Sequence, residues 1–166
     1  KIAHGNDVSL QAGFTVQRSR YKEMTYWSED ESVAGTKNMP RTPNCYGYFT
    51  LTAAPLKRFD ISLSGVYTGR MHVPHFAPTD EIPQGFAYTY IQKDEMVHTP
   101  DFFELNAKLS YTFVLREHMK IQLNGGVQNI LNAFQKDLDK GTFRDSGYFY
   151  GPTQPRTYFV GIKITQ

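Results

Sequence analysis

Cysteine is almost absent from this chain. Cys45 is the single residue of its type among 166, so no disulfide can form within the chain. The cysteine and histidine spacings of zinc sites are missing too. A disulfide-stapled scaffold and a cysteine-based zinc module are therefore excluded, and cysteine usage says little about compartment.

Long hydrophobic runs are missing as well. No stretch of about 18 apolar residues occurs, which excludes a transmembrane helix. The first ten residues, KIAHGNDVSL, lack the charged and then apolar plan of a signal peptide. The protein is thus expected either to be soluble or to span a membrane by strands. If it is exported, the signal lies upstream, so we expect a fragment that begins before Lys1.

No sign of charge dominates. The 18 Lys and Arg residues nearly balance the 16 Asp and Glu residues, for a net charge of +2, and both kinds are scattered. This distribution excludes a basic nucleic-acid face and a polybasic membrane segment. No nucleic-acid partner is expected.

Aromatic residues, in contrast, are abundant. The chain has 12 Phe, 11 Tyr and one Trp, yet its mean hydropathy is polar, at -0.49. A membrane barrel with an apolar outside, a wet inside and long polar loops combines these properties, because each strand alternates between lipid and lumen.

Six segments alternate between apolar and polar residues with the period of a β-strand. In the fourth, Phe103, Leu105 and Leu109 share one face, while Glu104 and Lys108 share the other. Most of these segments are about ten residues long or longer, which suits a tilted strand that crosses a bilayer. The predicted strands are 7–21, 46–53, 59–73, 102–113, 119–128 and 157–166.

The connections between these strands alternate in length. The long ones are 22–44, 74–101 and 132–156, and the short ones are 54–58 and 114–118. Outer-membrane barrels have short periplasmic turns and long external loops. The pattern therefore predicts that the first strand runs outward and that the last ends on the periplasmic side.

A soluble antiparallel sandwich accounts for the alternation equally well, with the apolar face inward. In that alternative the protein is a β-rich carbohydrate-binding module. The two hypotheses differ in whether a set of aliphatic and aromatic side chains points outward or into a core, namely Leu10, Phe14, Leu63, Leu105, Leu109, Ile121 and Ile162.

Three terminal segments carry a family resemblance. They are NGGVQNILN at 124–132, GYFYGP at 147–152 and PRTYFVGI at 155–162. In order, spacing and position they resemble the closing signature of TonB-dependent receptors. Weaker likenesses occur at 10–14, 41–43, 66–69 and 73–76, so the resemblance covers nearly the whole chain.

The resemblance implies an all-β fold, an antiparallel meander of six strands from a transmembrane barrel of about 22 strands. Residues 1–166 would be the C-terminal part of the barrel domain, without the plug domain and the earlier strands. It further implies a Gram-negative outer membrane, lipid contact, and a TonB partner acting through the absent plug.

The implied function is TonB-energised uptake of a large, scarce nutrient such as a siderophore, cobalamin, haem or a glycan. Neither an enzyme nor a resident cofactor is implied. Family barrels usually end on an aromatic residue, whereas this chain ends Lys163-Ile164-Thr165-Gln166. The isolated fragment, with two open edges and a broad apolar face, is expected to self-associate.

Physical reasoning assigns architectural roles to several residues of the signature. Gly125 and Gly126 are expected to allow bending or close packing in the fifth strand, and Pro152 and Pro155 to end the last loop. Arg156 is expected to anchor that loop by bonding carbonyls or carboxylates.

Candidate ligand contacts lie in the long connections, because external loops of such receptors meet the solute first. Aromatic rings there can stack on a sugar or a siderophore, and basic groups can bind acids. The candidates are Trp27, Arg70, His72, His75, Tyr88, Tyr90, Tyr148 and Tyr150.

Two metal sites are considered and not predicted. His72, His75 and His98, with Met71 and Met96, have soft or borderline ligand atoms but match no known spacing. Four residues weakly resemble a calcium loop without its bidentate Glu: Asp137, Asp139, Gly141 and Asp145.

A hydrolase is considered as well, because Asp60, Ser62, Ser64 and His72 are predicted to share one strand face. His72 lies eight residues beyond Ser64 in the sequence. That separation is more than about 20 Å along an extended strand, too far for a catalytic hydrogen bond.

Overall fold

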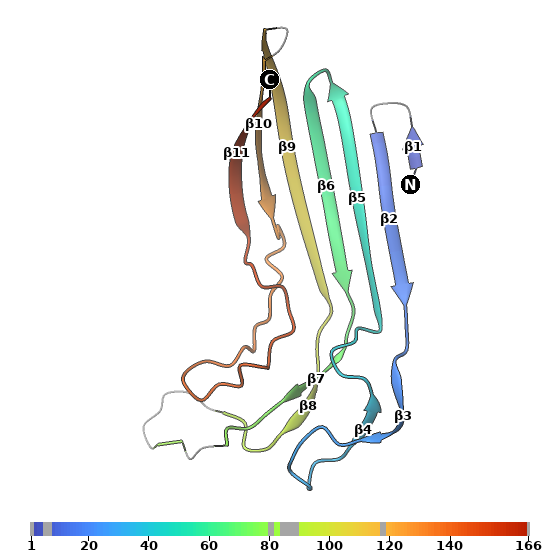
Figure 1. Cartoon of the computed structure of the whole chain (residues 1–166), viewed down its shortest axis with the longest axis vertical. Helices are drawn as coiled ribbons and strands as arrows, with labels where there is room; N and C mark the ends of the chain where they lie inside the picture. Colours follow the sequence, from blue (N-terminus) through green and yellow to red (C-terminus); the bar gives the residue numbers. More distant parts are fainter. Residues whose placement is uncertain (1, 5–7, 80–81, 84–89, 117–118, 166) are drawn as a thin grey trace.

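A computed structural model describes residues 2–4, 8–79, 82–83, 90–116 and 119–165. All its regular elements are strands, and its main sheet is antiparallel with seven strands in the order β1-β2-β5-β6-β9-β10-β11 (Figure 1). Their bounds are Ile2–His4, Val8–Val16, Cys45–Leu56, Phe59–Thr68, Phe102–Arg116, Met119–Gln128 and Thr157–Thr165. The predicted antiparallel meander of six strands is confirmed as β2, β5, β6, β9, β10 and β11.

Several predicted boundaries are wrong. The segment 7–21 is divided, because β2 ends at Val16 and β3 (Arg20–Thr25) leaves the sheet to pair with β4 (Thr36–Asn38). The segment opposite residues 17–19, between β4 and β5, contains Pro40 and Pro43, which have no N–H for a continued ladder. Asp7 and Gln166, at the ends of predicted strands, lie outside the described residues.

The predicted strand 59–73 is also too long. β6 ends at Thr68, and the chain then forms β7 (His72–His75), which pairs with β8 (Glu95–His98). β5 and β9 run three residues further than predicted, to Leu56 and Arg116. Two of the predicted long loops thus contain hairpins of their own, while residues 57–58 alone separate β5 from β6.

The strand register keeps the apolar side chains together on one face. Pairing across the sheet places Leu10, Leu51, Leu63, Ala107, Val127 and Tyr158 in one row. The next row, on the opposite face, contains Gln11, Thr50, Ser64 and Asn106. Because a slip of one residue would reverse this pattern, the register and the alternation specify each other.

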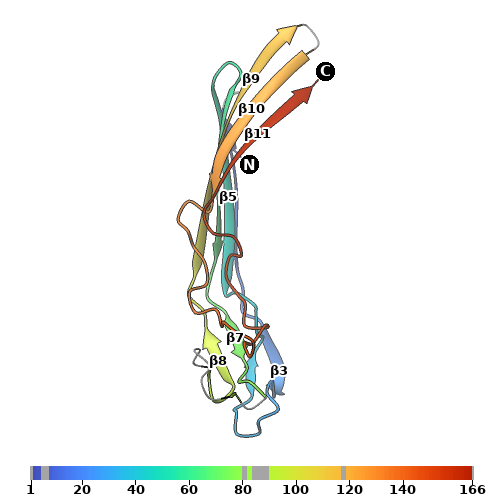
Figure 2. The same ribbon diagram turned by 90° about the vertical axis from the view of Figure 1, so that its left-hand side faces the viewer.

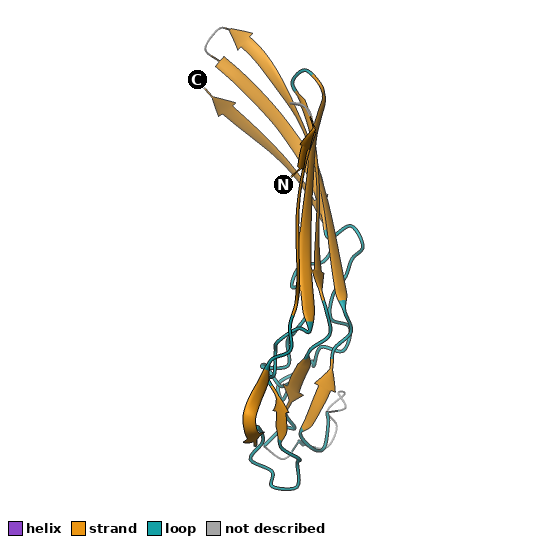
Figure 3. Ribbon diagram, turned by 90° about the vertical axis from the view of Figure 1, so that its right-hand side faces the viewer, coloured by secondary structure: helices purple, strands orange, loops and turns teal. Residues whose placement is uncertain are grey.

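Nothing within the described residues covers the apolar face. The sheet is a single layer, with the upper parts of β9, β10 and β11 bent away from the straighter strands (Figures 2 and 3). Val160 is 88% exposed, Ile162 67% and Phe14 66%. The sandwich core of the soluble alternative is therefore not found in the described part of the chain.

Most of the buried residues lie instead at or beyond the end of the sheet that carries the long connections. The buried hydrophobic side chains are Val73, Tyr90, Phe102 and Tyr148. No described helix has the length and apolar character needed to cross a bilayer.

The junction between β10 and β11 is fixed by one buried asparagine. Asn129 has a positive φ of 48° and is 2% exposed. Its side-chain amide donates to the carbonyls of Ala133 and Gln154, both at 2.8 Å, and its Oδ1 accepts from the Ala133 amide. Arg156 also anchors the loop as predicted, because its Nε donates to the Ile130 carbonyl at 2.8 Å.

The two adjacent glycines of β10 are not equivalent. A Cβ on Gly126 would lie 2.2 Å from the Ala107 carbonyl oxygen and under the Phe159 ring, whereas a Cβ on Gly125 would meet nothing nearer than 3.4 Å. Of the two expected roles, bending and close packing, close packing is confirmed at Gly126 and is not found at Gly125.

We predict that Gly126→Ala lowers stability by about 1–3 kcal/mol, because backbone must move to admit the methyl group. Gly125→Ala is the matched control and should change stability little. Thermal loss of β-structure, followed by circular dichroism in detergent, compares the two. Equal losses of stability in the two variants would contradict close packing at Gly126 alone.

Asn129→Ala should cost about 2–5 kcal/mol, since it leaves buried carbonyl and amide groups of the last loop without partners. Gln154→Ala is the control, because Gln154 contributes only its backbone carbonyl to this bond. Chemical denaturation of both variants provides the measurement, and a near-neutral Asn129→Ala would show that the junction is held elsewhere.

Candidate functional site

The three long connections pack together into one unit, here called the loop layer and defined as the described residues of 17–44, 69–101 and 129–156. Arg41 in the first donates to the Phe149 carbonyl in the third at 2.8 Å, and to that of Gly147. Ser28 donates to Asp94 in the second at 2.5 Å. The layer is therefore held by bonds between distant parts of the sequence.

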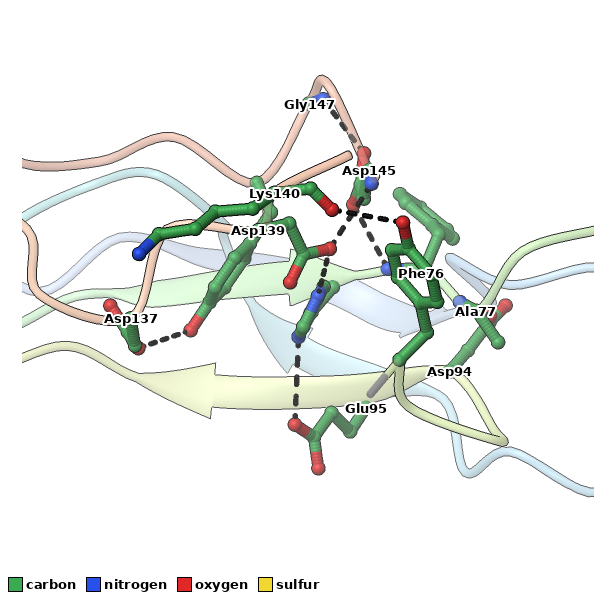
Figure 4. A network of polar contacts seen from close by, with 12 residues as sticks. Phe76, Ala77, Asp94, Glu95, Asp137, Asp139, Lys140, Asp145 and Gly147 are labelled. Atoms are coloured by element: carbon green, nitrogen blue, oxygen red, sulfur yellow. Dashed lines mark hydrogen bonds and ion pairs between the residues drawn. The ribbon is translucent and has the colours of Figure 1, made fainter. Parts of the chain in front are cut away.

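His75, on β7, joins the second and third connections. Its side chain is buried, with Nε2 at 2.9 Å from Asp139 Oδ2 and Nδ1 at 3.6 Å from Glu95 Oε1 (Figure 4). Its ring stacks on Tyr148, with centroids 3.7 Å apart and planes 11° apart. His75 is thus held within the protein by a hydrogen bond to Asp139, a carboxylate near its other nitrogen and a stacked ring.

Tyr148 and Tyr150 share one carboxylate. Their hydroxyls donate to the two oxygens of Asp137, at 2.7 Å and 2.6 Å. Burial, and then the hydrogen bond to Asp137, raises the pKa of Tyr150 to about 12 and raises the pKa of Tyr148 further. Burial alone would raise the pKa of Asp137, but the hydroxyls of Tyr150 and Tyr148 lower it overall.

The acidic residues that resemble a calcium loop bind protein donors instead. Asp139 accepts from the Asp145 amide at 3.1 Å as well as contacting His75. Asp145 accepts from the amides of Phe76 and Gly147, at 3.0 Å and 2.7 Å. Among the described residues, no group of three His, Cys, Asp or Glu residues is placed to hold a metal ion.

A second feature, here called the mouth pocket, lies where the loop layer meets the ends of β2, β5 and β6. It encloses about 240 Å³. Its lining is polar and basic, with two methionines, and contains no carboxylate. The lining residues are Gln17, Arg18, Ser19, Asn38, Met39, Thr42, Pro43, Asn44, Arg70, Met71, His72 and His98.

The histidines of the mouth pocket face each other across the β7–β8 hairpin. The ring centroids of His72 and His98 are 4.0 Å apart. The Asn38 side-chain amide lies 3.4 Å from His72 Nε2. Burial and, secondarily, the neighbouring His98 charge lower the pKa of His72, so His72 is neutral at neutral pH.

The predicted ligand residues therefore separate into groups. Arg70 and His72 line the mouth pocket. His75, Tyr148 and Tyr150 belong to the interior network, and Tyr90 is buried beside it, donating to the Lys140 carbonyl at 2.9 Å.

Trp27 lies outside both groups, against Phe76 with ring centroids 5.8 Å apart. Tyr88 falls outside the described residues. Sequence reasoning did not identify Arg18 and Asn38 as pocket residues, because loop contacts leave no periodic signal.

The residues considered for hydrolysis are separated. Ser62 and Ser64 line a groove of about 420 Å³ on the polar face of the sheet, together with Glu104 and Lys108. His72 lines the mouth pocket instead, next to Asn38 and His98.

Comparison with known proteins finds a likeness in structure. No protein-family model matches the chain, and no curated protein matches its sequence. The chain is similar to part of the ferric-catecholate import receptor Fiu from E. coli K12, in its closed form, with a TM-score of 0.58 and 19% identity. The match covers 96% of this chain but only 19% of the receptor chain. At this identity the likeness concerns the fold.

We predict that the loop layer loosens at both extremes of pH. Deprotonation of Tyr150 costs more in the folded layer than in an unfolded chain, so its contribution is complete below pH of about 10 and lost as pH rises through about 12. For Asp137, whose folded pKa is lowered, the contribution is present above its unfolded pKa and lost as pH falls through the folded one.

Tyrosinate absorbance of the wild type minus that of Tyr150→Phe measures the alkaline step. Tyr26→Phe, at an exposed position in the loop layer, is the control. Titration of Tyr150 near the ordinary tyrosine value would contradict its bond to Asp137.

Proposed function

We propose that this chain forms six adjacent strands in the wall of a larger β-barrel of a Gram-negative outer membrane, and that the barrel takes up a large, scarce solute with energy relayed by TonB. The remaining strands and a plug domain would lie in other parts of the protein. In this proposal the protein binds and transports its solute and is not an enzyme.

The observation that carries the proposal is the uncovered apolar face. Burying one Val, Leu, Ile or Phe side chain is worth about 1.5–3 kcal/mol, so an exposed face of several complete rows is unfavourable in water. Hydrocarbon removes that cost without any covering sheet. Outside the bulge at the β9–β10 turn, where Arg116 pairs with Met119, the described residues of this face in β2, β5, β6, β9, β10 and β11 include no Asp, Glu, Lys or Arg.

The opposite face suits an aqueous lumen. Glu104, Lys108 and Lys120 have their register positions there, among Ser, Thr and Asn residues. The sheet has open edges at β1 and β11, where further strands would continue the wall. Its curvature at β9, β10 and β11 is in keeping with closure (Figure 2).

The two ends of the sheet support an orientation. Short turns lie at one end and the loop layer at the other (Figure 1), so the loop layer would face outward and β11 would end on the periplasmic side. The similar receptor is described as an importer of ferric catecholates. For this chain the solute classes remain siderophore, haem, cobalamin or glycan, and the mouth pocket is the candidate contact.

The proposal predicts different environments for two adjacent β9 residues. Spin labels are attached at Leu109→Cys and Lys108→Cys of the complete protein in lipid bilayers, with Cys45→Ser as background. The Leu109 label should be relaxed by dissolved oxygen, which concentrates in hydrocarbon, and the Lys108 label by a water-soluble nickel chelate. The reverse result, or equal accessibility, would refute the membrane wall.

Accumulation of labelled solutes by whole cells tests the proposed transport function. Cells with and without the gene are given a labelled ferric catecholate, haem, cobalamin or maltooligosaccharide. Accumulation of at least one should require the gene and stop when a protonophore is added. Uptake that survives the protonophore or the loss of TonB would contradict an energised receptor.

A further inference from the structure

Two arginines line the mouth pocket without a partner among the described residues. Neither the Arg18 nor the Arg70 guanidinium has a hydrogen bond or ion pair to any described residue, whereas the guanidiniums of Arg41 and Arg156 bind backbone carbonyls. Acidic and basic residues are almost equal in number in the chain. A lining with two arginines and no carboxylate is therefore a local excess of positive charge.

The backbone beside these side chains is fixed. The Asn44 amide donates to the Arg70 carbonyl at 3.0 Å, and the Arg41 amide donates to the His72 carbonyl at 2.7 Å. On the side of the pocket formed by residues 17–19, the Gln17 side chain donates to the Pro43 carbonyl at 2.9 Å. The basic groups thus project from positions held by hydrogen bonds, which lowers the cost of ordering them around a ligand.

The remaining lining adds neutral hydrogen-bond donors. The Asn38 amide nitrogen can only donate, so His72 Nε2 accepts and the neutral ring carries its proton on Nδ1. A guanidinium supplies paired N–H groups that match the oxygens of a carboxylate or phosphate. Arginine, histidine and amide groups together make a site for an oxyanion.

The size of the pocket restricts what enters. Its volume of about 240 Å³ is below the range of pockets that enclose a whole drug-sized molecule. It accommodates one acidic group or one arm of a larger solute. The rest of the solute would extend toward the lumen and the other loops.

We propose that the mouth pocket binds an oxyanion group of the transported solute through Arg18 and Arg70, with His72 and Asn38 completing the site. This inference rests on the proposed function and narrows it, because it requires an acidic solute and excludes a neutral glycan as the main cargo.

The test uses the complete receptor in nanodiscs of zwitterionic lipid. Calorimetry measures the binding of a ferric tricatecholate complex, haemin, inorganic phosphate and a neutral maltooligosaccharide. The double variant Arg18→Gln/Arg70→Gln keeps the size and some hydrogen bonds but loses both charges. Arg144→Gln, an exposed arginine that lines a different cavity, is the matched control.

At least one anionic probe should bind about tenfold or more weakly to the double variant, as expected for lost charge-assisted hydrogen bonds. Its binding to the wild type should also weaken with salt, while Arg144→Gln remains within about twofold of wild type. Unchanged binding by the double variant, no binding of any anionic probe to the wild type, or tightest binding of the maltooligosaccharide would overturn the proposal.

A lipid phosphate could supply the same oxyanion, and a separate arm distinguishes it from the solute. Nanodiscs with anionic lipid and no solute test the lipid phosphate, and arginine-dependent binding seen there alone would overturn the solute assignment. The spin-label result at Leu109 and Lys108 is independent of both arginines. A confirmed membrane wall with an unaffected double variant would therefore refute the pocket and leave the proposed function intact.

Discussion

The structure depends on strand pairing in a register that keeps most apolar side chains on the same side of the sheet. Each strand alone has a weak two-faced pattern, but pairing joins the patterns into rows such as that from Leu10 to Tyr158. A shift by one residue in any pair would place aliphatic groups among Ser64, Asn106 and Lys108. The register is thus maintained by the environments on the two faces and not by a packed core.

The true core of the described chain lies in the loop layer, an unusual division for a chain of this size. Val73, Tyr90 and Tyr148 are buried there, and polar groups bind one another across connections that are far apart in sequence. Groups that would suit ligand binding are bonded within the protein here. His75 lies between Asp139 and Glu95, and Tyr148 and Tyr150 share the carboxylate of Asp137. A rigid loop layer leaves the mouth pocket as the place where basic groups remain available.

Residues of similar chemistry consequently have different roles. Arg41 and Arg156 donate hydrogen bonds to backbone carbonyls and so hold loops in place. Arg18 and Arg70 line a cavity and have no partner among the described residues. Gly126 lies against a backbone carbonyl and an aromatic ring that leave no room for a Cβ, whereas a Cβ on the adjacent Gly125 would make only ordinary van der Waals contacts. In each pair the difference arises from the neighbour across the sheet or the loop layer.

The sequence by itself determined the six main strands and their antiparallel order. It also determined that the long connections lie at one end of the sheet and the short ones at the other, because alternation and connection length are local properties of the chain. It also indicated the anchoring role of Arg156. It did not reveal the hairpins β3–β4 and β7–β8. For the first of these, the strand break follows from Pro40 and Pro43 in the segment opposite residues 17–19. Only the tertiary structure decided that His75 stacks on Tyr148 and that Arg18 lies with Arg70 and His72 in one pocket. Each of these contacts joins residues from different connections, and such contacts leave no period in the sequence.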